Sequence, residues 1–130
     1  MPALYAGIGC RRGCPVQALD QLLHEVLALH GLQPKALRGI ASIASKAAEP
    51  GLQQLATRYH LPLVLFEADQ LHAFQAQLSH RSAVAFAQTG CWGVAESAAL
   101  ALASLGHAHA NLRVTRQVLG PATLALACGE

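Results

Sequence analysis

The chain has 130 residues, of which 53% are apolar and 12% charged, with a formal net charge of +2 at pH 7. Globular proteins carry about 25% charged residues, so the deficit indicates surface hidden in a large core or in a homo-oligomer. The charge is too small for non-specific binding to nucleic acid, and no apolar stretch reaches the roughly 18 residues of a membrane span. Because the N-terminus also lacks the pattern of a signal peptide, we expect a cytoplasmic protein with one domain over residues 1–130, a typical length for one domain.

The first half of the chain predicts alternating strands and helices. An apolar run at 4–9 predicts a buried strand, and apolar residues spaced three and four apart over 15–30 predict an amphipathic helix. The pattern then repeats, with strands expected at 37–43 and 62–66 and helical segments after 49–51 and at 67–78.

The second half predicts a fourth strand at 83–87, a loop at 88–93, an Ala/Leu-rich helix at 94–105 and two final strands, at 112–115 and 122–127. The turn between the last two contains Gly120 and Pro121 and predicts an antiparallel hairpin. We therefore expect an α/β fold, a three-layer α/β/α domain with a mostly parallel sheet and a C-terminal antiparallel hairpin. Ligands of such sheets bind beyond the carboxyl ends of the strands, where the loops at 9–14, 42–49 and 88–93 are expected.

The first of these loops has the glycine pattern Gly7-x-Gly9-x-x-x-Gly13. Its third glycine comes one position too late for the dinucleotide fingerprint, and the Lys-Ser/Thr ending of a P-loop is missing. The loop instead places Arg11 and Arg12 beside the N–H groups of a helix start, which suits a carboxylate or another anion. A solvated turn with two surface arginines is the alternative. The ligand contacts expected from this loop are Gly9, Cys10, Arg11, Arg12 and Gly13.

The other two loops carry charged residues beside expected helix starts. Lys46 either faces a ligand or pairs with Glu49, whose position in a first helical turn is also explained by the helix dipole. Glu96 is either a general base, a ligand contact or a partner of its own helix dipole. Trp92, the sole tryptophan, is either a hydrophobic plug or a surface on which a planar ligand stacks. The candidates from these loops are Glu96 and Glu49 for catalysis, and Ser42, Lys46, Thr89, Gly90 and Trp92 for ligand binding.

The four cysteines and seven histidines show no metal-binding pattern. Three residues separate Cys10 from Cys14, rather than the two of a zinc knuckle, and no His-x-x-x-His pair occurs. In a reducing compartment the cysteines are expected to be free thiols. We expect neither a metal nor a cofactor.

Three segments, taken together, resemble the motifs of one family. Residues 7–13 (GIGCRRG) resemble its opening motif, and residues 42–52 (SIASKAAEPGL) resemble its second, S-I-x-x-K-x-x-E-x-G-L. Thr89-Gly90 with residues 94–99 (VAESAA) resembles its third, T-G-x-x-x-V-A-E-x-A-A. The motifs occur in register along essentially the whole chain. On these residues the chain resembles the CobE and CbiG C-terminal family of cobalamin (vitamin B12) biosynthesis, in its stand-alone CobE-like form.

The resemblance implies a role in corrin-ring synthesis by the oxygen-dependent pathway, with a precorrin intermediate as ligand. A precorrin is a large ring that carries acetate and propionate groups. The residues implied to pair with these carboxylates are Arg11, Arg12, Lys46, Arg113 and Arg116, and the flat ring would cover Trp92. Where the family commonly has a lysine in the late strand region, this chain has Arg113 and Arg116, which implies anion binding rather than amine chemistry.

Three roles are compatible with the resemblance. The protein binds a precorrin intermediate without chemistry of its own, or it is a hydrolase- or lyase-like enzyme that acts on a precorrin lactone or ring substituent, with Glu96 or Glu49 as base. In the third role it stabilises another enzyme of the cobalamin pathway as a partner protein. The sequence contains no compelling nucleophile–base pair, and this favours binding.

Overall fold

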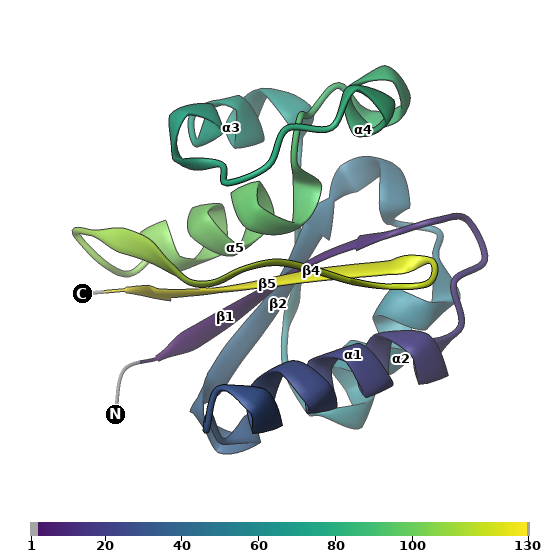
Figure 1. Cartoon of the computed structure of the whole chain (residues 1–130), viewed down its shortest axis with the longest axis vertical. Helices are drawn as coiled ribbons and strands as arrows, with labels where there is room; N and C mark the ends of the chain where they lie inside the picture. Colours follow the sequence, from purple (N-terminus) through teal and green to yellow (C-terminus); the bar gives the residue numbers. More distant parts are fainter. Residues whose placement is uncertain (1–2, 130) are drawn as a thin grey trace.

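A computed structural model describes residues 3–129 (Figure 1). The strands are β1 (Leu4–Cys10), β2 (Leu37–Ile43), β3 (Leu63–Phe66), β4 (Ala110–Leu119) and β5 (Ala122–Gly129). The α-helices are α1 (Val16–Leu29), α2 (Pro50–Arg58), α3 (Ala68–His72), α4 (Ala83–Thr89) and α5 (Val94–Ser104). Short 3-10 turns lie at η1 (Pro34–Ala36), η2 (Ala44–Lys46) and η3 (Gln75–Gln77). No helix within residues 3–129 is long and apolar enough to cross a membrane.

The strands form one sheet in the order β3-β2-β1-β5-β4. β1 pairs in parallel with β2, and β2 pairs in parallel with β3. β5 pairs antiparallel with both β1 and β4, so it alone opposes the common direction of the other described strands. The expected α/β sheet with a C-terminal antiparallel hairpin is confirmed, and the hairpin lies beside the first strand of the chain.

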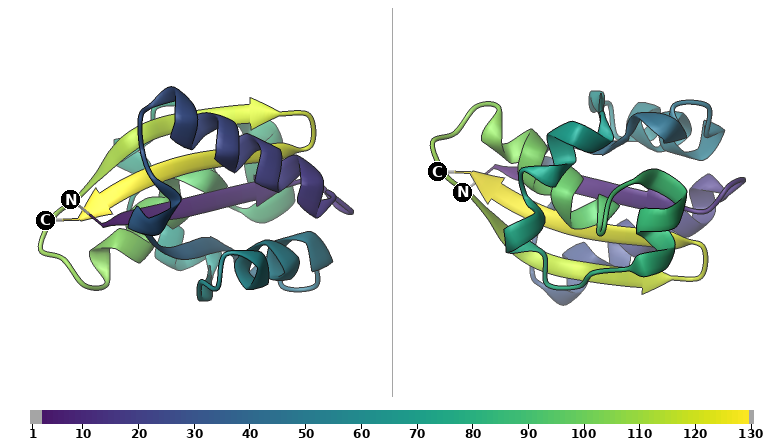
Figure 2. Two further views of the ribbon diagram at one scale, coloured as in Figure 1. Left: turned by 90° about the horizontal axis from the view of Figure 1, so that it is seen from below. Right: turned by 90° about the horizontal axis from the view of Figure 1, so that it is seen from above.

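Helices cover both faces of the sheet. In Figures 1 and 2, α1 and α2 lie against one face and α5 lies against the other, with α3 and α4 beyond α5. The outer helices explain why every residue of α5 from Ala95 to Ala103 is buried. The helix is rich in alanine and leucine because it is enclosed on two sides. A helix with an exposed face would carry polar residues on that face.

The prediction of a strand at 83–87 is wrong, because these residues belong to helix α4. The alternation of alanine with Val84 and Phe86 resembles a strand, but alanine has the highest helix propensity of all residues. Ser82 caps the helix by accepting a hydrogen bond from the N–H of Ala85 at 3.1 Å, and Gly90 ends it with a positive φ of 77°. The segment at 67–78, expected to be helical, contains the short α3 and the turn η3.

Helix α5 lies unusually close to β1. A Cβ built on Gly7 would be 1.8 Å from the carbonyl oxygen of Ala95 and 2.6 Å from the N–H nitrogen of Ala99. Gly7 therefore serves the contact between helix and strand, and the following turn begins further along the chain. This approach brings the start of α5, with Glu96, close to the end of β1.

On the opposite face, Asp20 of α1 is bonded to the end of α2. Its carboxylate accepts hydrogen bonds from Arg58 Nη1 at 2.7 Å and from the Tyr59 hydroxyl. Burial disfavours the ionised form of Asp20, but the hydrogen bonds from Tyr59 and Arg58 outweigh it and lower the carboxyl pKa. The contact therefore stabilises the packing of α1 on α2 as long as Asp20 is ionised.

We expect Asp20→Asn to lower the free energy of unfolding by about 1 kcal/mol at pH 7. Because the folded-state pKa lies below the unfolded value, near 3.9, this contribution is present above that value and disappears as the pH falls through the folded-state pKa. Urea unfolding of both proteins from pH 7 down to pH 2.5 measures the difference. Glu25→Gln, an exposed carboxyl on the same helix, is the control. A difference that stays constant over this range contradicts the interpretation.

Candidate functional site

A cleft with a volume of about 310 Å³ lies at the carboxyl end of β1. It is lined by Gly9, Cys10 and Arg11 from β1 and its turn, Lys46 from η2, and Ser82, Val84, Ala85, Gln88 and Thr89 from the α4 region. The start of α5 adds Trp92, Gly93, Val94, Ala95 and Glu96, and the hairpin adds Arg116, Val118, Gly120, Pro121 and Thr123. The loops expected at 9–14, 42–49 and 88–93 all contribute to this lining, the second through Lys46, which confirms that they meet at one cleft. The third loop follows helix α4 and not a strand.

The turn after β1 is fastened to both neighbouring loops. The N–H of Arg11 donates to the carbonyl of Pro121 at 3.0 Å, which ties the turn to the hairpin. The N–H of Gly13, at a φ of 75°, donates to Glu49 Oε2 at 2.9 Å. Glu49 therefore holds the turn in place from the start of α2, and it does not line the cleft.

Ser42 also has a structural contact. Its buried hydroxyl donates to the carbonyl of Ile8 at 2.7 Å and joins the ends of β1 and β2 beneath the site. Ser42 does not line the cleft because it belongs to the buried end of β2. The exposed part of the loop begins only with η2.

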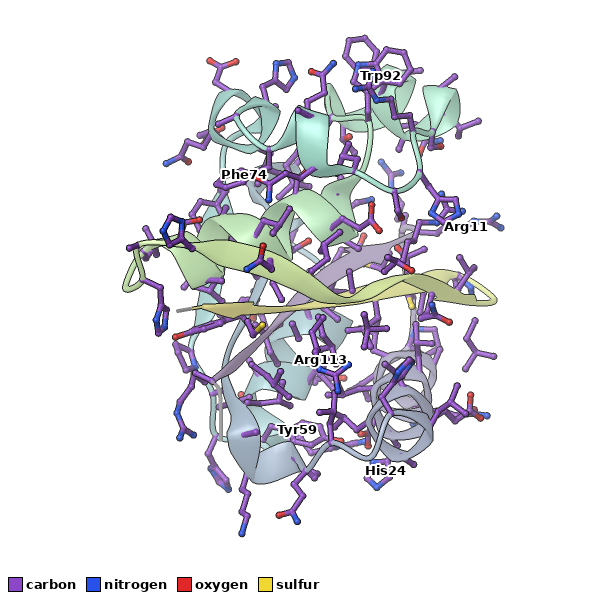
Figure 3. All side chains as sticks on the ribbon, turned by 60° about the vertical axis from the view of Figure 1, so that its left-hand side comes forward. Arg11, His24, Tyr59, Phe74, Trp92 and Arg113 are labelled. Carbon is purple, nitrogen blue, oxygen red and sulfur yellow. The ribbon has the colours of Figure 1, made fainter. Side chains whose placement is uncertain are left out.

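The candidate residues divide into two groups. Those that line the cleft are Gly9, Cys10, Arg11, Lys46, Thr89, Trp92, Glu96 and Arg116. Those outside its lining are Arg12, Gly13, Ser42, Glu49, Gly90 and Arg113. Figure 3 shows Arg113 on the α1 side of the sheet, whereas Trp92 lies on the α4 side and Arg11 lies at the end of β1. The predicted cluster of five basic residues therefore contributes Arg11, Lys46 and Arg116 to the cleft.

Strand alternation separates Arg113 from Arg116, because residues three positions apart in β4 point to opposite faces of the sheet. The pairing of β4 with β5 shifts after Leu112 and again between Val114 and Gln117. Such irregularities leave a backbone group without its ladder partner. Here the N–H of Arg116 donates instead to Glu96 Oε2 at 2.9 Å. The irregular pairing thus leaves the N–H of Arg116 free for Glu96, which accepts it beside the cleft.

Glu96 is 1% exposed and joins three segments of the chain. Besides the Arg116 N–H, it accepts the N–H of Ser79 at 2.8 Å and the Ser79 hydroxyl. Both carboxylate oxygens are engaged in these bonds, and the residue that caps α5 is Gly93, without a side chain. Glu96 therefore fixes the start of α5 between β4 and the segment that leads into α4.

The electrostatic character of the cleft is positive. Within residues 3–129, the side chains of Arg11, Lys46 and Arg116 form no ion pair and no hydrogen bond with the protein, since the ion pairs there involve Asp20. Glu96 supplies the single carboxylate among the described lining residues, and its oxygens are already hydrogen-bonded. The cleft therefore presents cations without internal counterions, an arrangement that attracts an anion.

The remaining lining of the cleft includes apolar side chains. Trp92 stacks on Phe86 of α4, with ring centroids 4.4 Å apart and an angle of 21° between the planes. Val84 from α4 and Val118 from β4 also line the cleft and are largely exposed. Sequence reasoning missed Val84 because it assigned 83–87 to a sheet strand, and it missed Val118 because it ended the penultimate strand at 115, whereas β4 extends to Leu119. The signal available for the helix was Ser82, a favoured helix N-cap residue, before an alanine-rich segment.

Cys10 lines the cleft and has a half-buried thiol. Burial raises its pKa to about 11, with a further rise from the nearby Cys14 and an opposing effect of Lys46. The thiol is therefore protonated at neutral pH and is a weak nucleophile.

We expect the native Cys10 thiol to react slowly with iodoacetamide at pH 8 and faster as the pH rises toward 11. Mass spectrometry of the labelled peptide measures the rate, and Cys10→Ser identifies the signal. After denaturation without reductant, all four cysteines should react, because none forms a disulfide within residues 3–129. Fewer than four reactive thiols, or fast labelling of native Cys10 at pH 8, contradicts this expectation.

The comparisons with known proteins agree with one another. The family described as cobalamin synthesis G C-terminus matches residues 4–127. Protein CobE of Sinorhizobium sp is 38% identical over 126 residues, which cover 93% of this chain and 82% of that protein. The crystal structure of CobE, a protein from the cobalamin (vitamin B12) biosynthetic pathway, has a TM-score of 0.92 at 44% identity and covers 98% of this chain and 93% of that chain.

Two further relatives extend the comparison. Cobalamin biosynthesis protein chiG from Agrobacterium tumefaciens str. C58 has a TM-score of 0.75 at 30% identity, covering 98% of this chain and 99% of that chain. A cobalt-precorrin-5A hydrolase of Salmonella typhimurium (strain LT2) is 44% identical over 72 residues, which are 55% of this chain but 20% of that protein. The chain belongs to the cobalamin synthesis G C-terminus family and is a cobalamin biosynthesis protein similar to CobE.

Proposed function

We propose that the cleft binds a polycarboxylated precorrin intermediate of the oxygen-dependent corrin pathway. The observation that carries the proposal is the set of three cations, Arg11, Lys46 and Arg116, which face one cleft without partners inside the described chain. Precorrins carry several acetate and propionate groups on one ring. Guanidinium groups bind carboxylates through two parallel hydrogen bonds, so the arginines suit such a ligand better than a single point charge does.

The size of the cleft limits how much of the ligand it encloses. At about 310 Å³ it is at the small end of the range of ligand pockets. A precorrin macrocycle is larger than this volume. The bound form therefore places one edge of the ring and its carboxylate arms in the cleft, with the rest of the ring outside.

The chemistry of the lining supports binding over catalysis. Both oxygens of Glu96 accept hydrogen bonds that hold the fold, so the carboxylate is not free to remove a proton from a ligand. Burial keeps the pKa of the Cys10 thiol at about 11, so it is not an activated nucleophile. The second carboxylate candidate, Glu49, bonds to Gly13 and lies outside the lining.

Mixing the purified protein with successive pathway intermediates tests the proposal. We expect the absorption spectrum of one intermediate to shift on binding, its mass to stay unchanged, and the fluorescence of Trp92, the single tryptophan, to change. A new product mass would favour the enzyme alternative, with chemistry on a lactone or ring substituent. Absence of any interaction would favour the role as a partner of another pathway enzyme.

A further inference from the structure

Helix α4 is apolar but buries none of its residues. Its sequence, AVAFAQT, contains no charged residue, and no residue of the helix is buried. Val84 is 67% exposed and Phe86 is 39% exposed. An exposed apolar patch on a small domain is characteristic of a contact with a ligand or a partner.

A second exposed valine lies on the same cleft as Val84. Val118 of β4 is 54% exposed, and both valines line the cleft that contains the three unpaired cations. The two side chains come from separate elements, α4 and the hairpin. The cleft therefore combines an apolar rim with cations, and these features match a ligand that has an apolar body and anionic arms.

We propose that Val84 and Val118 are specificity-determining residues that contact the apolar face of the tetrapyrrole ring, while the cations bind its carboxylates. This inference rests on the proposed function and adds how the site distinguishes a tetrapyrrole from other polyanions. Ring binding removes the exposed valine surface from water and is favoured in proportion to the apolar surface that it buries. A compact polyanion without a large ring gains only the contacts with the cations.

Hydrogen bonds at both ends of α4 hold the helix in place, so that it can support the contact of Val84 with the ring. The N–H of Ser82 donates to the carbonyl of Trp92 at 2.8 Å, and the N–H of Gly90 donates to the carbonyl of Phe86 at 2.8 Å, so residues 82–92 form a unit closed at its base. His72 Nε2 donates to the carbonyl of Gly90 at 2.5 Å and joins this unit to α3. Val84 is thus held in position relative to Trp92 before any ligand binds, which lowers the entropy cost of binding.

The test replaces both valines by threonine, which keeps the branched shape while it introduces a hydroxyl, so the fold should be preserved. Two probes are compared by titration: an octacarboxylic porphyrin, which has a large flat ring, and benzenehexacarboxylate, which has a high charge on a small ring. We expect the double variant Val84→Thr with Val118→Thr to bind the porphyrin about tenfold more weakly and benzenehexacarboxylate as the unmodified protein does. Leu29→Gln, at an exposed leucine outside the cleft lining, is the matched control and should change neither affinity.

The outcomes separate this inference from the proposed function. Unchanged porphyrin binding by the valine variant, or an equal loss for both probes, overturns the role of the valines and leaves the anion site standing. Binding of benzenehexacarboxylate without the porphyrin by the unmodified protein also overturns it. Failure of the unmodified protein to bind either probe overturns the proposed function together with this inference.

Discussion

Replacing Arg11 and Arg116 together with glutamine is expected to weaken the binding of a polycarboxylated tetrapyrrole by roughly 10- to 100-fold. Arg116 is half-buried and fixed through its own backbone by Glu96, so its loss should account for the larger part. Arg11 is exposed, and an exposed ion pair contributes less than about 1 kcal/mol. Glutamine removes the charge and keeps a polar side chain, although a shorter one, so the change tests the loss of the guanidinium group. Isothermal titration of the unmodified protein and the double variant measures the difference.

The matched control for this experiment is Arg12→Gln. Arg12 follows Arg11 in the same turn and is exposed, but it does not line the cleft. We expect its replacement to change the affinity less than about twofold. Affinity should also fall as the salt concentration rises, because salt screens exposed charges. Two results would refute the anion site. One is an Arg12 variant that binds the ligand as weakly as the double variant does. The other is an affinity that changes neither with the double substitution nor with the salt concentration.

The sequence predicted the sheet and the helices that lie directly on it because their apolar patterns are strong. The strand expected at 37–43 has the bounds of β2, and the helix expected at 15–30 corresponds to α1. The prediction failed at 83–87, where Val84 and Phe86 alternate with alanine. That pattern fits a strand as well as a helix. The N-cap at Ser82 and the left-handed C-cap at Gly90 favour the helix. Alternation alone cannot distinguish these structures in so short a segment.

The meeting of the first two loops could be predicted, because β1 and β2 are parallel and the ends of parallel strands share one edge of a sheet. The third loop reaches the same cleft although it follows helix α4 and not the expected strand. The roles of single residues could not be predicted, because they depend on contacts across the fold. Glu49 is bonded to Gly13, 36 positions earlier, and Glu96 is bonded to Arg116, 20 positions later. Arg113 and Arg116 point to opposite faces because β4 extends through both residues, whereas the sequence predicted a strand only at 112–115. The basic residues could be identified from the sequence. Which of them face the cleft depends on the backbone geometry, and this is known only from the structure.

Gly7→Ala should lower the free energy of unfolding by at least about 3 kcal/mol. The new methyl group would lie 1.8 Å from the carbonyl oxygen of Ala95, and since this oxygen belongs to the backbone of α5, the whole helix must shift. Replacing glycine by alanine stabilises a compatible site by about 0.4–1 kcal/mol through the unfolded chain, which is too little to offset such a clash. Urea unfolding monitored by circular dichroism measures the loss.

The control for this prediction is Gly106→Ala, since a Cβ at Gly106 would meet nothing within 4 Å and its φ is not positive. We expect this variant to be as stable as the unmodified protein or slightly more stable. The displacement in the Gly7 variant would begin at the turn of α5 that carries Glu96, so the bond from Glu96 to the Arg116 N–H should weaken as well. The folded fraction of Gly7→Ala should therefore bind the porphyrin probe more weakly than the unmodified protein, while Gly106→Ala binds it normally. A Gly7 variant with unchanged stability would mean that α5 does not require the close approach to β1 on which the geometry of the cleft depends.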